Sequence, residues 1–137
     1  NDYRVLPNFA SNIKSNLPLN IYSSGNQTRT YCYITDAIVG FLKVILNGFS
    51  GEAYNIGNSE PEISVIELFE IIQKILPNSL QRLNVDYPST YPTDEPQRRC
   101  PDISKAQNHL NFIPTVDIED GLKRFLTWTN LNYKTDI

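Results

Sequence analysis

The chain has 137 residues, of which 40% are hydrophobic and 20% charged, and its formal net charge is −3 at pH 7. That length suits one domain, or part of one, with a real hydrophobic core. The mixed, slightly acidic charge includes no basic run that would indicate nucleic acid as the partner. The longest apolar stretch, around residues 37–46, is interrupted by Gly40 and Lys43 and is too short to span a membrane.

Residues that bind metal ions are scarce. Cys32 and Cys100 lack the spacing of metal ligands, and His109 is the only histidine, so we expect no metal site and a reduced, intracellular setting. No signal-peptide pattern is present. The sequence contains no methionine. We therefore expect a piece of a longer protein, with a trimmed whole domain as the alternative.

The first part of the chain predicts a helix and two strands. Apolar residues recur with helical spacing over residues 4–16, and Pro18 ends that helix. Residues 19–22 alternate in the manner of a short strand, and residues 23–26 have the composition of a turn. Residues 28–33 are aromatic and β-branched at alternate positions and predict a second strand.

A further helix is predicted over residues 37–47, with Thr35 or Asp36 as its N-cap. This helix is apolar on almost every side, which is typical of a helix that is buried on more than one side. Two interpretations remain open. It is the central core helix of the domain, or it is covered by a neighbouring domain.

After this helix the sequence predicts a strand over residues 53–56 and then an amphipathic helix. Ser64 and Glu67 have the spacing of a capping box at the start of that helix, and Pro77 lies just past its end. A strand over residues 83–87 follows.

The segment 88–101 is rich in proline and polar residues and is too long for a simple connection, which favours a functional loop. Asp102 or Ser104 begins a short helix to about residue 110, and the last helix covers residues 117 to about 131. Together these elements predict an α/β fold with short strands and about five helices.

Motifs of catalysis are absent from the sequence. It contains no Gly-x-Gly-x-x-Gly, no Walker loop, no Gly-x-Ser-x-Gly elbow and no tyrosine followed four positions later by lysine. We interpret His109 as structural, and Asp94 and Glu95 as solvated loop carboxylates rather than an acid–base pair. The sequence therefore predicts groups that hold a ligand and no catalytic residue.

Arginine and tyrosine are the residues best suited to hold that ligand. Arg29 lies between threonines in a predicted strand, and Arg98 and Arg99 precede a helix. Each guanidinium group can bond two oxygens of a phosphate or carboxylate. Tyr22 offers an aromatic face to a nucleobase, whose edge the backbone of residues 19–21 could read. We hypothesise that the two halves of the chain close on one anionic, ring-bearing ligand, and a surface ion pair is the alternative for each arginine alone.

Six short motifs follow one another along nearly the whole chain: VLPNF at 5–9, LNIY at 19–22, GNQTR at 25–29, YITD at 33–36, YNIGN at 54–58 and RRCPDISKA at 98–106. This ordered set resembles the C-terminal half of extended short-chain dehydrogenases/reductases that act on nucleotide sugars. UDP-glucuronate decarboxylases and dTDP-glucose 4,6-dehydratase-like enzymes are the most similar groups. The motifs identify the family and leave epimerase, dehydratase and decarboxylase reactions open.

The resemblance implies an NAD-dependent parent enzyme whose NAD fingerprint and Tyr-x-x-x-Lys pair belong to an N-terminal Rossmann domain missing from this sequence. Residues 1–137 would then form its nucleotide-sugar-binding C-terminal region, and about 30–60 would pack on the Rossmann domain. The implied partner is a UDP- or dTDP-sugar, with neither nucleic acid nor membrane involved. The implied location is the cytoplasm, or the Golgi lumen for a eukaryotic UDP-glucuronate decarboxylase. A non-catalytic domain that senses nucleotide sugars or mediates interactions is the alternative.

The resemblance also assigns residues to the substrate, and it assigns none to catalysis or to a metal. The implied set is Tyr22, Ile21 and Pro7 for the base, Arg29, Arg99 and Arg98 for the ribose and diphosphate, and Asn58 and Asn8 elsewhere near the ligand.

Overall fold

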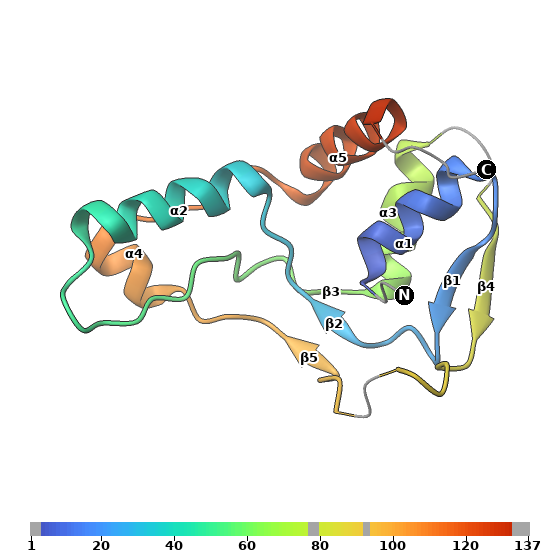
Figure 1. Cartoon of the computed structure of the whole chain (residues 1–137), viewed down its shortest axis with the longest axis horizontal. Coiled ribbons are helices and arrows are strands. Elements are labelled where there is room, and N and C mark those ends of the chain that lie inside the picture. Colours follow the sequence, from blue (N-terminus) through green and yellow to red (C-terminus); the bar gives the residue numbers. More distant parts are fainter. Residues whose placement is uncertain (1–3, 77–79, 92–93, 133–137) are drawn as a thin grey trace.

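The computed structural model describes residues 4–76, 80–91 and 94–132 (Figure 1). Five helices and five short strands occur in this part of the chain, which confirms the predicted α/β class with about five helices. In chain order the elements are α1 (Val5–Lys14), β1 (Leu19–Tyr22), β2 (Thr28–Arg29), α2 (Ile34–Asn47), β3 (Ile63–Ser64), α3 (Val65–Ile75), β4 (Arg82–Val85), β5 (Arg98–Arg99), α4 (Ser104–Leu110) and α5 (Ile118–Asn132).

The molecule is elongated, with a larger lobe of α1, α3, α5, β1 and β4 and a smaller lobe of α2 and α4 (Figure 1). In the larger lobe, β1 lies beside β4 in a parallel pair. Leu19 and Ile21 of β1 are fully buried in the core, whereas Asn20 and Tyr22 are only partly buried. Because side chains alternate between the faces of a strand, Asn20 and Tyr22 point away from this core.

A second, three-stranded sheet has the strand order β3-β2-β5. The central strand β2 is antiparallel to β3 and parallel to β5. In the parallel pair, Thr28 lies opposite Arg98, and Arg29 lies opposite Arg99. Residues that face each other on neighbouring strands project from the same side of a sheet. Arg29 and Arg99 therefore share one face, and Arg98 projects from the other.

The helix α3 begins as the sequence predicts. Ser64 Oγ accepts a hydrogen bond of 3.1 Å from the Glu67 backbone, and a Glu67 carboxylate oxygen accepts one of 2.7 Å from the Ser64 backbone. This reciprocal arrangement is a capping box, and it is confirmed. The apolar side of α3 then closes the core of the larger lobe with Val65, Leu68, Phe69 and Ile72.

The predicted strand at 28–33 is wrong in part, and the predicted strand at 53–56 is wrong in whole. The first stops at Arg29, because β3 and β5 are only two residues long; just beyond it, the Thr30 N–H still donates to the Arg99 carbonyl at 3.2 Å. Residues 53–56 form no strand. Tyr54 and Ile56 instead pack on the small core of α4, which fixes this segment through side chains rather than through a ladder of backbone hydrogen bonds.

The helix α2 is not the central core helix that its apolar composition allowed. Only Asp36 and Gly40 among its residues are buried. Large apolar side chains on and just after α2 are about half or more exposed: Ile34, Ile38, Val39, Phe41, Leu42, Ile45, Leu46 and Phe49. None of the helices in the described ranges is both long enough and apolar enough to cross a membrane.

The predicted N-cap of α2 is also wrong. The helix begins at Ile34 after Tyr33, without a side-chain cap. The Asp36 carboxylate accepts hydrogen bonds of 2.9 Å from the backbone N–H groups of Thr115 and Val116, and one of 3.1 Å from the Thr115 hydroxyl. Asp36 thus ties α2 to the link that precedes α5, because the longer-range donors outcompete a local cap.

We predict that Asp36→Asn lowers the free energy of unfolding at pH 7 by about 2 kcal/mol, because an amide donor then faces backbone donors. Burial raises the pKa of the Asp36 carboxyl, but the hydrogen bonds from Val116 and Thr115 outweigh burial and hold that pKa below its ordinary value. A lowered carboxyl pKa stabilises the fold above the ordinary value of about 4, and this stabilisation is lost as the pH falls through the lowered pKa.

Chemical denaturation at pH 7 and pH 3 measures both effects. The difference in unfolding free energy between wild type and Asp36→Asn should shrink at pH 3. The exposed Glu119→Gln, also near the start of a helix, is the control and should stay within about 0.5 kcal/mol. A penalty for Asp36→Asn of equal size at both pH values would contradict the proposed ionic hydrogen bonds.

Candidate functional site

A pocket of about 240 Å³ lies where α1, β1, β2 and β5 come together. We call it the arginine–tyrosine pocket, because arginines and tyrosines account for six of its thirteen lining residues. The lining residues are Arg4, Val5, Asn8, Asn20, Tyr22, Gln27, Arg29, Thr30, Tyr31, Val65, Tyr91, Glu95 and Arg99.

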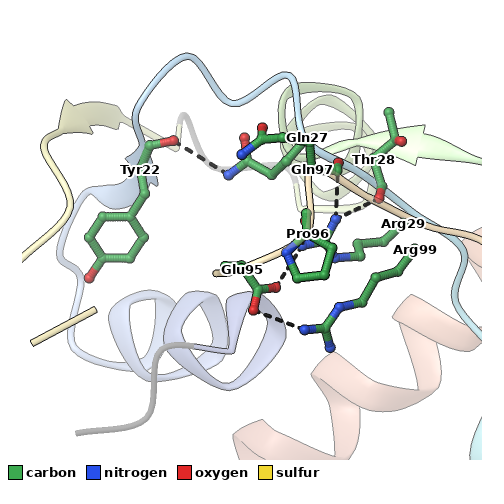
Figure 2. Close-up of polar contacts among 8 residues, drawn as sticks. All are labelled: Tyr22, Gln27, Thr28, Arg29, Glu95, Pro96, Gln97 and Arg99. Carbon is green, nitrogen blue, oxygen red and sulfur yellow. Dashed lines mark hydrogen bonds and ion pairs between the residues drawn. The ribbon is translucent and has the colours of Figure 1, made fainter. Parts of the chain in front are cut away.

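At one end of the pocket, Arg29 and Arg99 converge on the carboxylate of Glu95 (Figure 2). Arg29 Nη2 is 2.7 Å from Glu95 Oε1, and Arg99 Nη2 is 2.9 Å from Glu95 Oε2. The Arg29 side chain is only 16% exposed, whereas that of Arg99 is 57% exposed. The interpretation of Glu95 as a solvated loop carboxylate is therefore wrong, because each of its oxygens bonds one arginine.

At the other end, Tyr22 belongs to a cluster of three aromatic rings. Its ring stacks on that of Tyr87 with 5.7 Å between centroids and 16° between planes. The ring of Tyr91 lies 5.8 Å from that of Tyr22 and 4.3 Å from that of Tyr87. Tyr87 and Tyr91 were not predicted from the sequence as part of the site. Their signal in the sequence is a pair of tyrosines four residues apart at the start of the proline-rich segment. The turn between them is closed by a hydrogen bond of 2.8 Å from the Tyr91 N–H to the Pro88 carbonyl.

Two residues that line the pocket each carry a buried polar atom without a hydrogen-bond partner in the described part of the protein. Among the described residues, Asn8 Oδ1 and the Tyr31 hydroxyl are buried without a hydrogen bond, and both residues line the pocket. Buried polar groups are almost always hydrogen-bonded, so each such exception needs an explanation.

Four of the eight residues assigned by resemblance come together in the pocket: Asn8, Tyr22, Arg29 and Arg99. Arg98 does not, because Nε and Nη2 bond the Glu62 carboxylate on the other face of the sheet at 2.7–3.0 Å. Asn58 accepts a hydrogen bond from the backbone of Glu60 at 3.3 Å in a separate turn. Ile21 is fully buried in the core, so only its backbone can face a ligand, and Pro7 does not line the pocket.

Neither a group of metal ligands nor a histidine is found among the described residues that line the pocket. Within the described ranges, no group of three or more His, Cys, Asp and Glu side chains is placed to hold a metal ion. His109 lies in the smaller lobe, where its Nδ1 is 3.3 Å from the Tyr54 hydroxyl and its ring centroid is 5.0 Å from that of Phe49. What the pocket offers chemically is an aromatic surface beside a pair of cationic groups.

Residues 1–57 match the NAD dependent epimerase/dehydratase family. The chain is 32% identical over 127 residues to UDP-glucuronic acid decarboxylase 1 of Arabidopsis thaliana. This match covers 92% of this chain and 28% of the relative. The chain is also 34% identical over 134 residues to dTDP-D-glucose 4,6-dehydratase of Homo sapiens. That match covers 95% of this chain and 37% of the relative. The chain thus spans about a third of the length of these curated relatives.

Solved structures show the same likeness. UDP-glucuronic acid 4-epimerase from Bacillus cereus, in complex with UDP-glucuronic acid and NAD, superposes with a TM-score of 0.83 at 28% identity, over 96% of this chain and 41% of that chain. DesIV, a dTDP-glucose 4,6-dehydratase from Streptomyces venezuelae with NAD and TYD bound, superposes with a TM-score of 0.82 at 26% identity. The match covers 94% of this chain and 39% of the DesIV chain. The fold is that of the C-terminal part of an extended short-chain dehydrogenase/reductase, as the resemblance implied.

We predict that Tyr31 ionises only well above the ordinary pKa of a tyrosine. Burial raises the pKa of Tyr31 to about 12, and the positive charge of Arg29 partly opposes that rise. In an absorbance titration of folded protein, Tyr31 should remain mostly protonated at pH 11, and Tyr31→Phe should remove the ionisation step near pH 12. Because the folded pKa lies above the ordinary value of about 10, wild-type stability falls as the pH rises from 10 towards 12, and the variant loses less.

At pH 7, Tyr31→Phe should cost less than about 1 kcal/mol, since the hydroxyl has no partner to lose. Tyr54→Phe is the matched control, because the Tyr54 hydroxyl accepts a hydrogen bond of 3.2 Å from the Phe49 backbone. This substitution should lower the free energy of unfolding by more than Tyr31→Phe does. Full ionisation of all tyrosines below pH 11 in the folded state would show that Tyr31 is not buried in this way.

Proposed function

We propose, on the premise that this chain belongs to the NAD dependent epimerase/dehydratase family, that it binds the nucleoside-diphosphate part of a nucleotide sugar. Relatives that carry UDP-glucuronic acid or dTDP-glucose in their names support a UDP- or dTDP-sugar as the ligand class. Because the chain covers only part of these relatives, the activity of the whole protein is part of the proposal.

One observation carries the proposal: a single pocket joins an aromatic cluster to a pair of converging guanidinium groups. A nucleoside diphosphate has the same two-part chemistry, a flat ring at one end and a diphosphate at the other. Aromatic side chains stack on nucleobases, and guanidinium groups bond phosphate oxygens two at a time. Asn8 and Tyr31 also line this pocket, and we propose that they lie near the ribose.

In the proposed complex, the base stacks on Tyr22 and the backbone around Ile21 faces its edge. The diphosphate lies at the arginine end, against Arg99 and near Arg29. Arg98, Asn58 and Pro7 receive no contact inside the pocket, since none of them lines it. Between the two neighbouring arginines of β5, the sheet geometry therefore favours the second as the ligand contact.

The whole protein is proposed to oxidise a hexose hydroxyl and then to eliminate water, release carbon dioxide or reduce the keto-sugar on its other face. NAD supplies the hydride acceptor for such chemistry. This chain has neither the glycine-rich fingerprint nor a Tyr-x-x-x-Lys pair, so its own residues do not fit NAD or the catalytic base. We assign both to a Rossmann domain outside these residues, while this chain contributes binding energy and orientation from the nucleotide end.

The exposed apolar side of α2 supports a second part of the proposal. Contiguous apolar patches on soluble proteins mark binding surfaces more often than chance. Most of the large apolar residues of α2 are exposed, as described above. The charged Lys43 of α2 instead bonds the carbonyls at the end of α4 at 2.7–3.1 Å. We propose that about residues 30–60 pack on the Rossmann domain.

A non-catalytic domain that senses nucleotide sugars is the rival from another class. It would use the same pocket and would need no hydride chemistry. A Tyr-x-x-x-Lys pair in the rest of the parent sequence argues for the enzyme, and its absence argues for the sensor.

Calorimetric titration with UDP and with inorganic pyrophosphate tests the nucleotide site. Tyr22→Ala should weaken UDP binding about 10-fold or more, because base stacking contributes about 1–3 kcal/mol. It should leave pyrophosphate binding unchanged, and Tyr22→Phe should retain UDP binding because the ring remains. Folded wild-type protein that binds neither probe would overturn the proposed function.

A pair of charges on α2 tests the docking surface. Ile45 and Leu46 are both 77% exposed, so Ile45→Lys with Leu46→Lys should change the stability of this chain by less than about 0.5 kcal/mol and leave its UDP affinity unchanged. In the longer parent the same pair should abolish NAD-dependent turnover. Leu131→Lys on α5, equally exposed, is the control and should preserve turnover. Normal turnover by the double variant would contradict the proposal that α2 packs on the Rossmann domain.

A further inference from the structure

A second pocket, of about 220 Å³, lies between α1, the segment that precedes α2 and the start of α5. We call it the α5 pocket. It is separate from the arginine–tyrosine pocket, although Tyr31 lines both. Most of its wall is apolar and comes from Leu6, Ile34, Val116, Ile118, Leu122 and Phe125.

The carboxylate and the thiol that line the α5 pocket are already bound to the backbone. Asp117 Oδ1 accepts a hydrogen bond of 2.9 Å from the Asp120 N–H in the first turn of α5. The Cys32 thiol donates to the Tyr33 carbonyl at 3.7 Å. Small-molecule sites combine an apolar wall with a few polar groups that orient the ligand. With these two groups engaged, the pocket is better suited to an apolar side chain than to a polar small molecule.

The mouth of the α5 pocket is continuous with the exposed apolar side of α2. Ile34 is the first residue of α2, lines the pocket and is largely exposed. Ile38 and Phe41 are also exposed and follow at four and seven positions, which places them on the same side of the helix. A neighbour that covers this side of α2 therefore reaches the mouth of the pocket as well.

We infer that the α5 pocket receives one large apolar side chain of the Rossmann domain and thereby fixes where that domain sits against α2. The identity of the neighbour rests on the proposed function. The matches cover 28% and 37% of two curated relatives, so most of a parent of similar length lies outside these residues and can supply the side chain. A cavity of about 150 Å³ can hold a benzene ring. The α5 pocket therefore has room for an aromatic or a branched aliphatic side chain.

A pocket adds something that the flat side of α2 lacks. Hydrophobic contact has no direction, so an apolar surface alone leaves the position of a neighbour loosely defined. The walls of the α5 pocket are held in place. Asp36 of α2 bonds the backbone of Thr115 and Val116 on one side, and Leu122 is buried in the core of the larger lobe on the other (Figure 1). Side chains that enter such pockets carry much of the binding energy of an interface.

Filling the pocket from within this chain tests the inference. A Cβ atom on Gly121 would lie 3.4 Å from the Tyr33 ring, which is an ordinary contact. Gly121→Ala therefore fits, and Gly121→Leu extends into the pocket that Gly121 lines. In this chain alone, neither substitution should lower the midpoint of thermal unfolding, because both residues are better helix formers than glycine. Both variants should also keep the UDP affinity of the wild type.

In the longer parent, Gly121→Leu should lower NAD-dependent turnover about 10-fold or more, because its side chain takes the place of the incoming one. Gly121→Ala is the matched control and should turn over as the wild type does. Normal turnover by Gly121→Leu would overturn the inference.

Alkylation of Cys32 is a second test, and it requires no substitution. Cys32 lines the pocket and is partly buried, so its reaction with iodoacetamide, followed by peptide mass spectrometry, reports whether the pocket is open. Burial and the negative charge of Asp36 raise the pKa of the Cys32 thiol, so this chain and the parent are compared at one pH. Cys32 should react about 10-fold more slowly, or slower still, in the parent. Equal rates would contradict a filled pocket.

The inference and the proposed docking of α2 fail in different ways. If Ile45→Lys with Leu46→Lys abolishes turnover and Gly121→Leu does not, the neighbour lies on α2 but is not anchored in the α5 pocket. If the double variant turns over normally, the docking of α2 is wrong and the inference fails with it.

Discussion

The parallel pairing of β2 with β5 is the contact on which the candidate site depends. It is only two residues long, yet it joins parts of the chain that are about 70 residues apart in sequence. Its register decides that Arg29 and Arg99 face the same side. A shift by one residue would turn Arg98 into the pocket and Arg99 towards Glu62. The hydrogen bonds from Arg29 to the segment 95–97 reinforce this short pairing from the side.

Local chemistry explains which parts of the fold and site could be predicted from the sequence. The capping box at Ser64 and the strand at Leu19–Tyr22 are set by neighbouring residues and were predicted correctly, and α1 ends before Pro18, at Lys14 rather than at the predicted residue 16. The ordered motifs likewise pointed to Tyr22 and to an arginine at 98–99 as ligand-binding candidates, roles that stay proposals. These features need no knowledge of which distant segments meet.

The features that were missed depend on distant contacts. Choosing between Arg98 and Arg99 requires the register of β5 against β2, which no local pattern encodes. Glu95 looked solvated because its arginine partners are supplied by two different strands. Asp36 looked like a helix cap because its partners at Thr115 and Val116 lie 79 and 80 positions away. For Glu95 and Asp36, a donor far away in the sequence outcompeted the local interpretation.

The division of the molecule into two lobes has a consequence for how it unfolds. Among the residues that the structure describes, the larger lobe has its own core of ten buried residues, and the smaller lobe has a separate cluster of four. Cooperative, all-or-none unfolding requires that such cores share contacts, and a small lobe with few buried residues can open on its own. Asp36 stands at the junction, where it binds α2 to the link before α5. A covered α2 would therefore do more than dock a neighbour: it would make the smaller lobe fold together with the rest.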